Sequence, residues 1–319
     1  AAAEIAPVRT SSQTVNVFVR TQDAWTTNLK LSAATEGGRH SFGFGFEEDN
    51  LLGYGKSVSI ERSQSGGTRS NSVGYGDPRF LGSRLRLNLG YARGSTGDTG
   101  LASLTKPFYA LESTRAQSVA WSRSLTDAVI PENGEEFSKY REQRRQVEAS
   151  VGARLNADRL FVQRVEAGWY ADRAQYDPLA ATVPGTLPTD RELSGPTLGY
   201  AWVQPRYVKE TYIDAMERVE DFNLGNELSF RGGWMGRAVG SNRDRLIYNV
   251  SDQQGFSLGP GRFVIGRIGA GGRVARSRAE NALITAGLTG FWKTRWRGDH
   301  TWVAHLEGSS EYLSVTLNH

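Results

Sequence analysis

Apolar and polar residues alternate with a period of two through residues 39–91. Three phenylalanines alternate with glycines in Phe42–Phe46, and in Leu85–Tyr91 the apolar residues alternate mainly with arginine and asparagine. Because successive side chains of a β-strand point to opposite faces of a sheet, this period predicts strands with one apolar face. The stretch alone does not say whether that face meets a protein core or lipid.

Two turns of similar sequence indicate that the repeating unit is an antiparallel hairpin. Asn50–Gly53 reads Asn-Leu-Leu-Gly, and Arg79–Gly82, 29 residues further along, reads Arg-Phe-Leu-Gly. This spacing is the length of two strands with their connections. Extended along the chain, the pattern predicts an all-β fold, an antiparallel transmembrane β-barrel of about 16 strands, within a range of about 12 to 16. The expected strands are 28–33, 39–46, 56–62, 71–75, 85–91, 101–110, 117–124, 146–155, 160–172, 198–204, 207–213, 226–235, 246–251, 262–270, 282–292, 301–306 and 312–317.

Two connections between these strands look long, the charged residues 126–142 and residues 177–190 with three prolines. Residues 93–100 read as a polar loop. Long loops at one rim and short turns at the other are typical of barrels and unusual in compact soluble domains. Two stretches are ambiguous, because the charge spacing of 135–145 suits a helix and 207–219 fits a helical period as well as a strand.

The composition fits a barrel better than a helical membrane protein. Of 319 residues, 37 are glycine and 10% are aromatic, and the mean hydropathy is −0.47. No apolar run approaches the roughly 18 residues that a spanning helix needs, whereas strands that alternate between lipid and lumen give a low mean hydropathy. We therefore expect a β-barrel at residues 25–319, either complete or cut short at the C-terminus. Residues 1–24 are expected to be a periplasmic leader or the remnant of a preceding domain.

Aromatic residues fall mostly near the ends of the expected strands, as Trp121, Trp169 and Trp292 do. This placement is typical of the aromatic girdles that mark the two membrane interfaces. It predicts a chain in the bacterial outer membrane, in contact with outer-membrane lipid and lipopolysaccharide. Aromatic residues are also common in soluble sheets, so a soluble all-β binding protein remains an alternative.

Few side chains in the sequence could perform chemistry. Cysteine is absent, which excludes disulfides and thiolate sites. The excess of 38 basic over 34 acidic residues is too small to indicate nucleic-acid binding. The best constellation is Asp299, His300, His305 and Ser309, and its spacing along a strand favours an ordinary barrel rim over a catalytic group. We predict no enzyme activity, no catalytic residue, no cofactor and no metal.

Two segments are similar to a known family. Phe44–Lys56 (Phe-Gly-Phe-Glu-Glu-Asp-Asn-Leu-Leu-Gly-Tyr-Gly-Lys) and Gly76–Leu85 (Gly-Asp-Pro-Arg-Phe-Leu-Gly-Ser-Arg-Leu) resemble the opening strands of the BamA-like bacterial surface antigen superfamily. The resemblance implies an outer-membrane barrel that inserts or translocates other proteins, with POTRA domains before it and a lateral seam between its first and last strands. It also implies a lumenal loop with an Arg-Gly-aromatic motif. Residues 1–24 are too few for a POTRA domain, and the nearest match to the motif, Arg231–Trp234, is expected in a strand.

The favoured function is therefore strand addition at a seam, with an unfolded or exported client protein as the partner. The seam strand is expected at 28–33, where Asn28, Lys30 and Ser32 share one face. The alternative is a passive pore or the membrane anchor of an exported effector. In that alternative the basic residues Arg84, Arg86, Arg154 and Arg164 line an aqueous lumen and favour anions.

Overall fold

The fold is seen in a computed structural model of the chain. The structure describes residues 2–9, 15–22, 25–36, 39–65, 68–158, 160–211, 213, 219–276, 278–294 and 300–313. Strands dominate, and the two helices described are single 3₁₀ turns, η1 (Leu51–Gly53) and η2 (Arg237–Val239). Within these residues, no helix is both long and apolar enough to cross a membrane.

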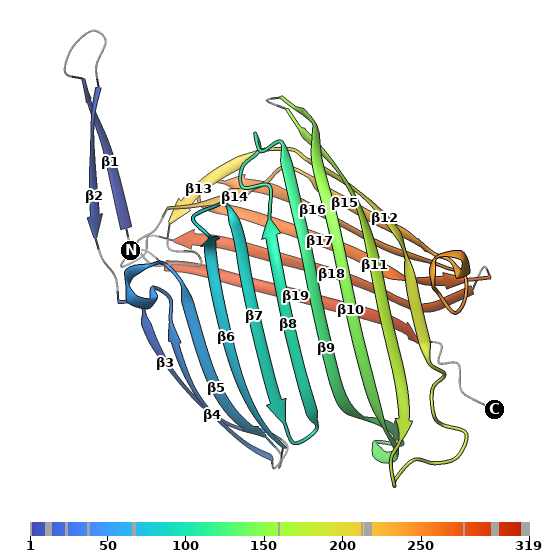
Figure 1. Cartoon of the computed structure of the whole chain (residues 1–319). Coiled ribbons are helices and arrows are strands. Elements are labelled where there is room, and N and C mark those ends of the chain that lie inside the picture. The colour runs from blue at the N-terminus through green and yellow to red at the C-terminus, as the bar shows by residue number, and fades with distance from the viewer. Residues whose placement is uncertain are drawn as a thin grey trace.

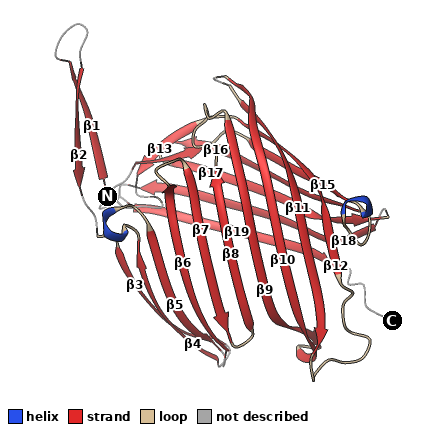
Figure 2. Cartoon of the chain, in the orientation of Figure 1, coloured by secondary structure: helices blue, strands red, loops and turns tan. Residues whose placement is uncertain are grey.

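Fifteen strands form one antiparallel sheet that curves back on itself (Figures 1 and 2). Neighbours in the sheet are neighbours in the chain, except that β12 pairs with β15 across a separate hairpin of β13 (Tyr207–Thr211) and β14 (Val219–Asn223). The all-β, antiparallel prediction is confirmed, and 15 strands fall within the expected range. The strands are β3 (Thr27–Glu36), β4 (Arg39–Glu48), β5 (Ser57–Ser65), β6 (Thr68–Phe80), β7 (Leu85–Gly94), β8 (Gly97–Lys106), β9 (Arg115–Glu132), β10 (Glu135–Ala157), β11 (Val162–Pro178), β12 (Arg191–Val203), β15 (Glu227–Met235), β16 (Arg245–Gly259), β17 (Arg262–Ala275), β18 (Arg278–Thr294) and β19 (His300–Leu313).

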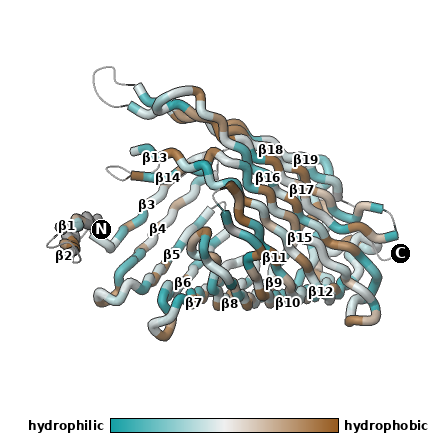
Figure 3. The backbone as a smooth tube through the Cα atoms, turned by 90° about the horizontal axis from the view of Figure 1, so that it is seen from above, coloured by the Kyte–Doolittle hydropathy of each residue, from teal (hydrophilic) through white to brown (hydrophobic). Residues whose placement is uncertain are grey.

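The period-two pattern places apolar side chains on the outer face of this sheet. Phe42 and Phe44 on β4 are 61% and 47% exposed, and Trp169 on β11 is 44% exposed. The register pairs Phe44 with Leu31 of β3, so the apolar side chains of neighbouring strands lie on the same face of the sheet. Figure 3 shows hydrophobic and hydrophilic positions alternating along the strands. Since no described element packs over these side chains, the outer face is apolar and uncovered.

The sheet is not closed by hydrogen bonds. Among the described residues, β3 pairs only with β4, and β19 pairs only with β18. The front wall of the curve is formed by β3–β12 and the back wall by β15–β19 (Figures 1 and 3). The two edge strands therefore keep one side of their backbone without a strand partner.

Two expected loops are wrong, because strands continue through them. The predicted loop at 93–100 is a two-residue connection between β7 and β8, and the predicted connection at 126–142 is the tip of the β9–β10 hairpin. Asn133 and Gly134 both have positive φ, at 53° and 85°, which matches the tight turn that joins two twisted strands. The ion pair between Asp127 and Arg141, with 2.7 Å between Oδ1 and Nε, joins the two strands below that turn. Charge spacing within 135–145 therefore reflects cross-strand pairing, and no helix forms there.

Two further strand predictions are corrected. The expected strand at 207–213 is β13 (Tyr207–Thr211), which pairs with β14 (Val219–Asn223) outside the main sheet. The expected strands at 301–306 and 312–317 belong to one strand, β19, as far as Leu313, and the remainder lies outside the described residues. The long connection at 177–190 is confirmed between β11 and β12.

The N-terminal residues form a separate hairpin of β1 (Ala2–Arg9) and β2 (Val15–Gln22). It projects from the end of the sheet at which β3 begins (Figure 1). Val17, Phe18 and Val19 are all more than half exposed on it.

Candidate functional site: the lumenal face and the two free edges

Polar side chains line the inner face of the curved sheet, which we call the lumenal face. Arg231 on β15 forms ion pairs with Glu148 on β10 and with Glu166 on β11. Two strands, β11 and β12, separate β15 from β10 in the sheet. The Arg231–Glu148 pair can therefore form only across the concave side, and it fixes which parity of each strand faces inward. Arg231–Trp234 lies within β15, as expected.

The most buried charges of the lumenal face lie at the end of the sheet opposite the N-terminal hairpin. The side chain of Asp172 is fully buried and accepts hydrogen bonds from Arg144 at 2.8 Å and from Arg191 at 3.1 Å. Nearby, Arg245 contacts Glu280 at 2.7 Å with only 7% of its side chain exposed. Buried charges are tolerated only when they are paired, so these contacts tie β10, β11 and β12 together, and β16 to β18.

The four arginines expected to line the lumen are placed differently from one another. Arg84 lies in the β6–β7 turn at the rim, where its carbonyl accepts a hydrogen bond from Tyr109. The alternation of side chains along β7, β10 and β11 places Arg86, Arg154 and Arg164 on the lumenal face.

Those three arginines contact the β8–β9 connection, residues 107–114, which folds against the lumenal face. The guanidinium of Arg86 lies 4.8 Å from the centre of the Tyr109 ring, and that of Arg164 lies 4.5 Å from the Phe108 ring. Arg164 also donates to the carbonyl of Ala110 at 3.0 Å, and Arg154 donates to that of Leu111 at 3.4 Å. These contacts hold residues 107–114 against the lumenal face and occupy part of the donor capacity of Arg154 and Arg164.

The residues of the expected seam all lie on β3, one of the two free edges. Asn28, Lys30 and Ser32 lie on the lumenal face of β3. Their partners on β4 are the residues that alternate with the outward-facing phenylalanines, so both sets face inward. The Lys30 ammonium lies 2.5 Å from Glu47 on β4 and its side chain is 63% exposed. Such an exposed pair is screened by water and contributes little to holding the strand.

The histidine and serine constellation is not assembled. Asp299 lies outside the described residues. His300 begins β19, and His305 contacts Thr289 at 2.9 Å and Glu307 at 3.3 Å. Ser309 lies four residues beyond His305 on the same strand, a separation of about 13 Å at the usual rise. No group of three or more potential metal-binding side chains occurs in the described part of the chain.

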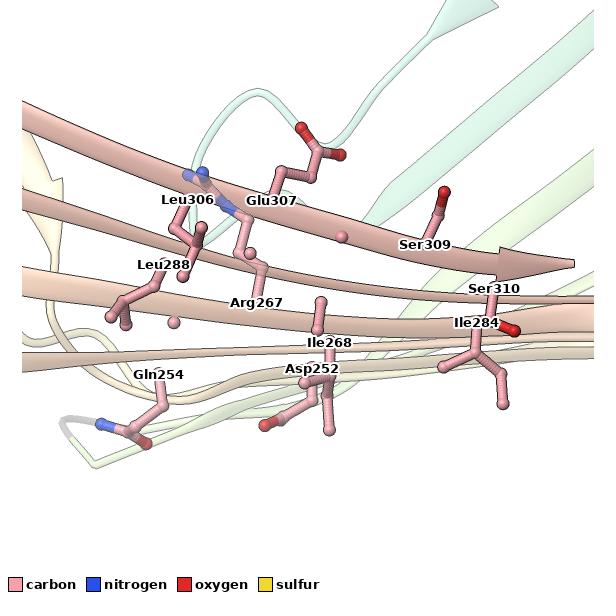
Figure 4. A pocket seen from close by; sticks show the side chains of 14 residues that line it. Asp252, Gln254, Arg267, Ile268, Ile284, Leu288, Leu306, Glu307, Ser309 and Ser310 are labelled. Atoms are coloured by element: carbon pink, nitrogen blue, oxygen red, sulfur yellow. The ribbon is translucent and has the colours of Figure 1, made fainter.

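A groove runs over the outer face of β16–β19, with a volume of about 840 Å³. The small residues Gly266, Ala286 and Gly308 leave room for it, and Ile268, Ile284, Leu288 and Leu306 border it (Figure 4). Its apolar border belongs to the same uncovered outer face as the phenylalanines of β4.

The sequence reasoning missed one feature of the lumenal side. The β13–β14 hairpin does not extend the sheet, and it packs against β17 and β18 from inside the curve. No signal in the sequence marks this hairpin, because Phe222 and Leu224 alternate with the polar Asn223 as residues of a wall strand do.

These features define an all-β protein built on one large antiparallel sheet with an apolar outer face and a polar inner face. No family model matches the chain, and no curated protein matches it in sequence. Among solved structures, it is similar to BamA from Haemophilus ducreyi lacking POTRA domains 1–3, with a TM-score of 0.40 and 9% sequence identity. The match covers 98% of this chain and 63% of that one, so the chain spans less than two thirds of its length. A likeness this remote has no bearing on family membership or function.

Proposed function

We propose that this chain is a bacterial outer-membrane β-barrel protein that accepts strands of an unfolded or exported client protein at a lateral seam between β3 and β19. The observation that supports the proposal is the pair of free edges in the 15-stranded sheet. An uncovered edge presents unpaired N–H and C=O groups, which an incoming strand can satisfy by pairing. In lipid these groups have no water to bind, so their tendency to pair is stronger than in solution.

The distribution of side chains across the sheet supports the proposed outer-membrane location. Leu31, Phe44 and Trp169 expose apolar surface outward, whereas Glu148, Glu166 and Arg231 form ion pairs inside. A soluble sandwich has the opposite arrangement, with its apolar parity packed against a second layer. Outward apolar side chains around a polar interior are typical of barrels in a membrane.

A cross-linking experiment tests the seam. A single cysteine at Lys30 of β3 or at Ser309 of β19 is placed in a chain that has none of its own. Both variants should form an adduct with a client polypeptide that carries a cysteine and is stalled during insertion. Ser103 on β8 is the matched control, because β8 pairs on both sides. Absence of an adduct at both edges, or an equal yield at Ser103, would contradict the proposal.

A passive pore is the second candidate, and the lumenal parity of Arg86, Arg154 and Arg164 supports it. Planar-bilayer recordings discriminate the two functions. A stable, anion-selective conductance of the wild-type protein without any client supports the pore, and its absence together with client adducts supports the seam.

A further inference from the structure

The β13–β14 hairpin, described at residues 207–211, 213 and 219–223, packs in an apolar cluster on the lumenal side. We call it the inner hairpin. Its exit residue, Leu224, is 3% exposed and packs with Phe263 and Ile265 of β17, which are 2% and 4% exposed. Val208 and Phe222 of the inner hairpin pack against the same cluster. An apolar cluster of this kind contrasts with the ion pairs that line the rest of the lumenal face.

The register shows that the inner hairpin lies on the inner side of the wall. Arg231 of β15 faces inward and pairs with Asn249 of β16, which in turn pairs with Gly271 of β17. Phe263 and Ile265 lie on the same face of β17 as Gly271, which is the inner face. The exposed Ile268 lies on the opposite, outer face of the strand. Figures 1 and 3 show the inner hairpin between the front wall and the back wall, at the end where β3 begins.

Aromatic rings hold the inner hairpin to the wall. The Phe222 ring centroid lies 5.1 Å from that of Phe263 and 5.6 Å from that of Phe291 on β18. Phe263 and Phe291 stack on each other at 4.7 Å. Aromatic pairs at these separations are favourable beyond the burial of their surface.

A glycine on the wall makes room for the inner hairpin. A Cβ at Gly255 of β16 would lie 2.5 Å from the Cα of Leu224, which is backbone and cannot turn aside. Gln254 on the same strand donates to the Leu224 carbonyl at 3.1 Å. The wall is therefore shaped to fit the exit residue of the inner hairpin.

An ion pair holds the other strand of the inner hairpin. The Lys293 ammonium on β18 lies 3.2 Å from Glu210 on β13 and 3.2 Å from the hydroxyl of Thr211. Both charged side chains are about four-fifths buried, at 22% and 18% exposed. Partial burial makes such a pair stronger than a surface pair and sensitive to the loss of either partner.

We propose that the inner hairpin is a plug that restricts passage through the lumen at the N-terminal end of the barrel. The β8–β9 connection, held by Arg86 and Arg164, occupies the facing wall at the same end. The two segments narrow the lumen from both sides. This role is independent of strand addition at the seam, because it concerns the space inside the barrel.

The first test measures whether the inner hairpin is seated. The chain has no cysteine, so a single Val208→Cys substitution, close in size to valine, reports how accessible position 208 is to a thiol reagent. Val219→Cys is the exposed comparison, because Val219 is 67% exposed. In the folded, detergent-solubilised protein we expect a polar maleimide to label Val208→Cys slowly and Val219→Cys fast. Adding Gly255→Val should speed labelling at position 208 by about tenfold or more, because it raises the population of the open state. Gly287→Val is the control, since its Cβ would meet nothing closer than 3.8 Å.

The second test measures conductance in planar bilayers. Gly255→Val, Glu210→Lys and Lys293→Glu should each raise the conductance above that of the wild type and of Gly287→Val. Because Gly255→Val can impair folding, the double variant Glu210→Lys with Lys293→Glu provides the sharper comparison, and it should return the conductance toward the wild-type value. Equal labelling rates at positions 208 and 219, unchanged by Gly255→Val, would refute the claim that the inner hairpin packs against the wall. Unchanged conductance in variants with fast labelling would refute the plug, and client adducts at Lys30→Cys would then still support the seam.

Discussion

Replacement of Asp172 by asparagine should cost more stability than any exposed ion pair of the sheet. The Asp172 carboxylate is fully buried and accepts three hydrogen bonds, two from Arg144 at 2.8 Å and 3.2 Å and one from Arg191 at 3.1 Å. Asparagine keeps the size of the side chain but removes its charge, which leaves two guanidinium groups without a counter-charge. Removing one partner of a fully buried pair costs about 3–5 kcal/mol.

The lower part of that range is expected here, because the Arg144 side chain is 35% exposed and stays partly hydrated. The Arg173–Glu192 pair provides the matched control, since both its side chains are more than 40% exposed. Glu192→Gln should cost less than about 1 kcal/mol. Urea unfolding in detergent, followed by the fluorescence of the eight tryptophans, measures both variants. Equal unfolding midpoints for Asp172→Asn and Glu192→Gln would refute the burial argument.

Two other substitutions test the turns and the lumenal packing. Gly134→Val forces a branched residue to a φ of 85°, and it should destabilise the tip of the β9–β10 hairpin by about 1 kcal/mol or more, read as faster protease cleavage at that tip. Cleavage at the wild-type rate would contradict the turn assignment. Gly152→Val places a Cβ within 3.1 Å of the Phe108 ring and should displace the β8–β9 connection, measured as faster maleimide labelling of Leu111→Cys. An unchanged labelling rate would show that this connection is not held against β10.

The sequence was sufficient to predict an all-β, antiparallel fold because alternation with period two is local. Phe42–Phe46 and Leu85–Tyr91 identify strands and one apolar face without any knowledge of their partners. Strand ends were harder to predict. Residues 126–142 are rich in charge, and charge in a single sequence indicates a loop as readily as a strand that extends beyond the apolar zone. The cross-strand pair Asp127–Arg141 shows that these residues belong to strands, and the pair is known only once the register of β9 and β10 is known.

The inner hairpin could not be predicted because its role depends on long-range contacts. Phe222 and Leu224 read as part of another wall strand, and Gly255 reads as one of many strand glycines. Their relation appears only when β16 and β17 bring Gly255 and Phe263 to the same inward patch. The lumenal parity of Arg86, Arg154 and Arg164 was predictable from alternation, whereas their contacts with residues 107–114 were not.

Quenching by brominated lipid tests most directly the claim that the apolar face of this sheet meets lipid. Fluorophores attached to single cysteines at Val151, which is 61% exposed on the outer face of β10, and at its neighbour Ser150, on the lumenal face, compare the two sides of one strand. In vesicles of brominated phospholipid we expect strong quenching at Val151 and little at Ser150. Equal quenching at both positions, or stronger quenching at Ser150, would contradict the account.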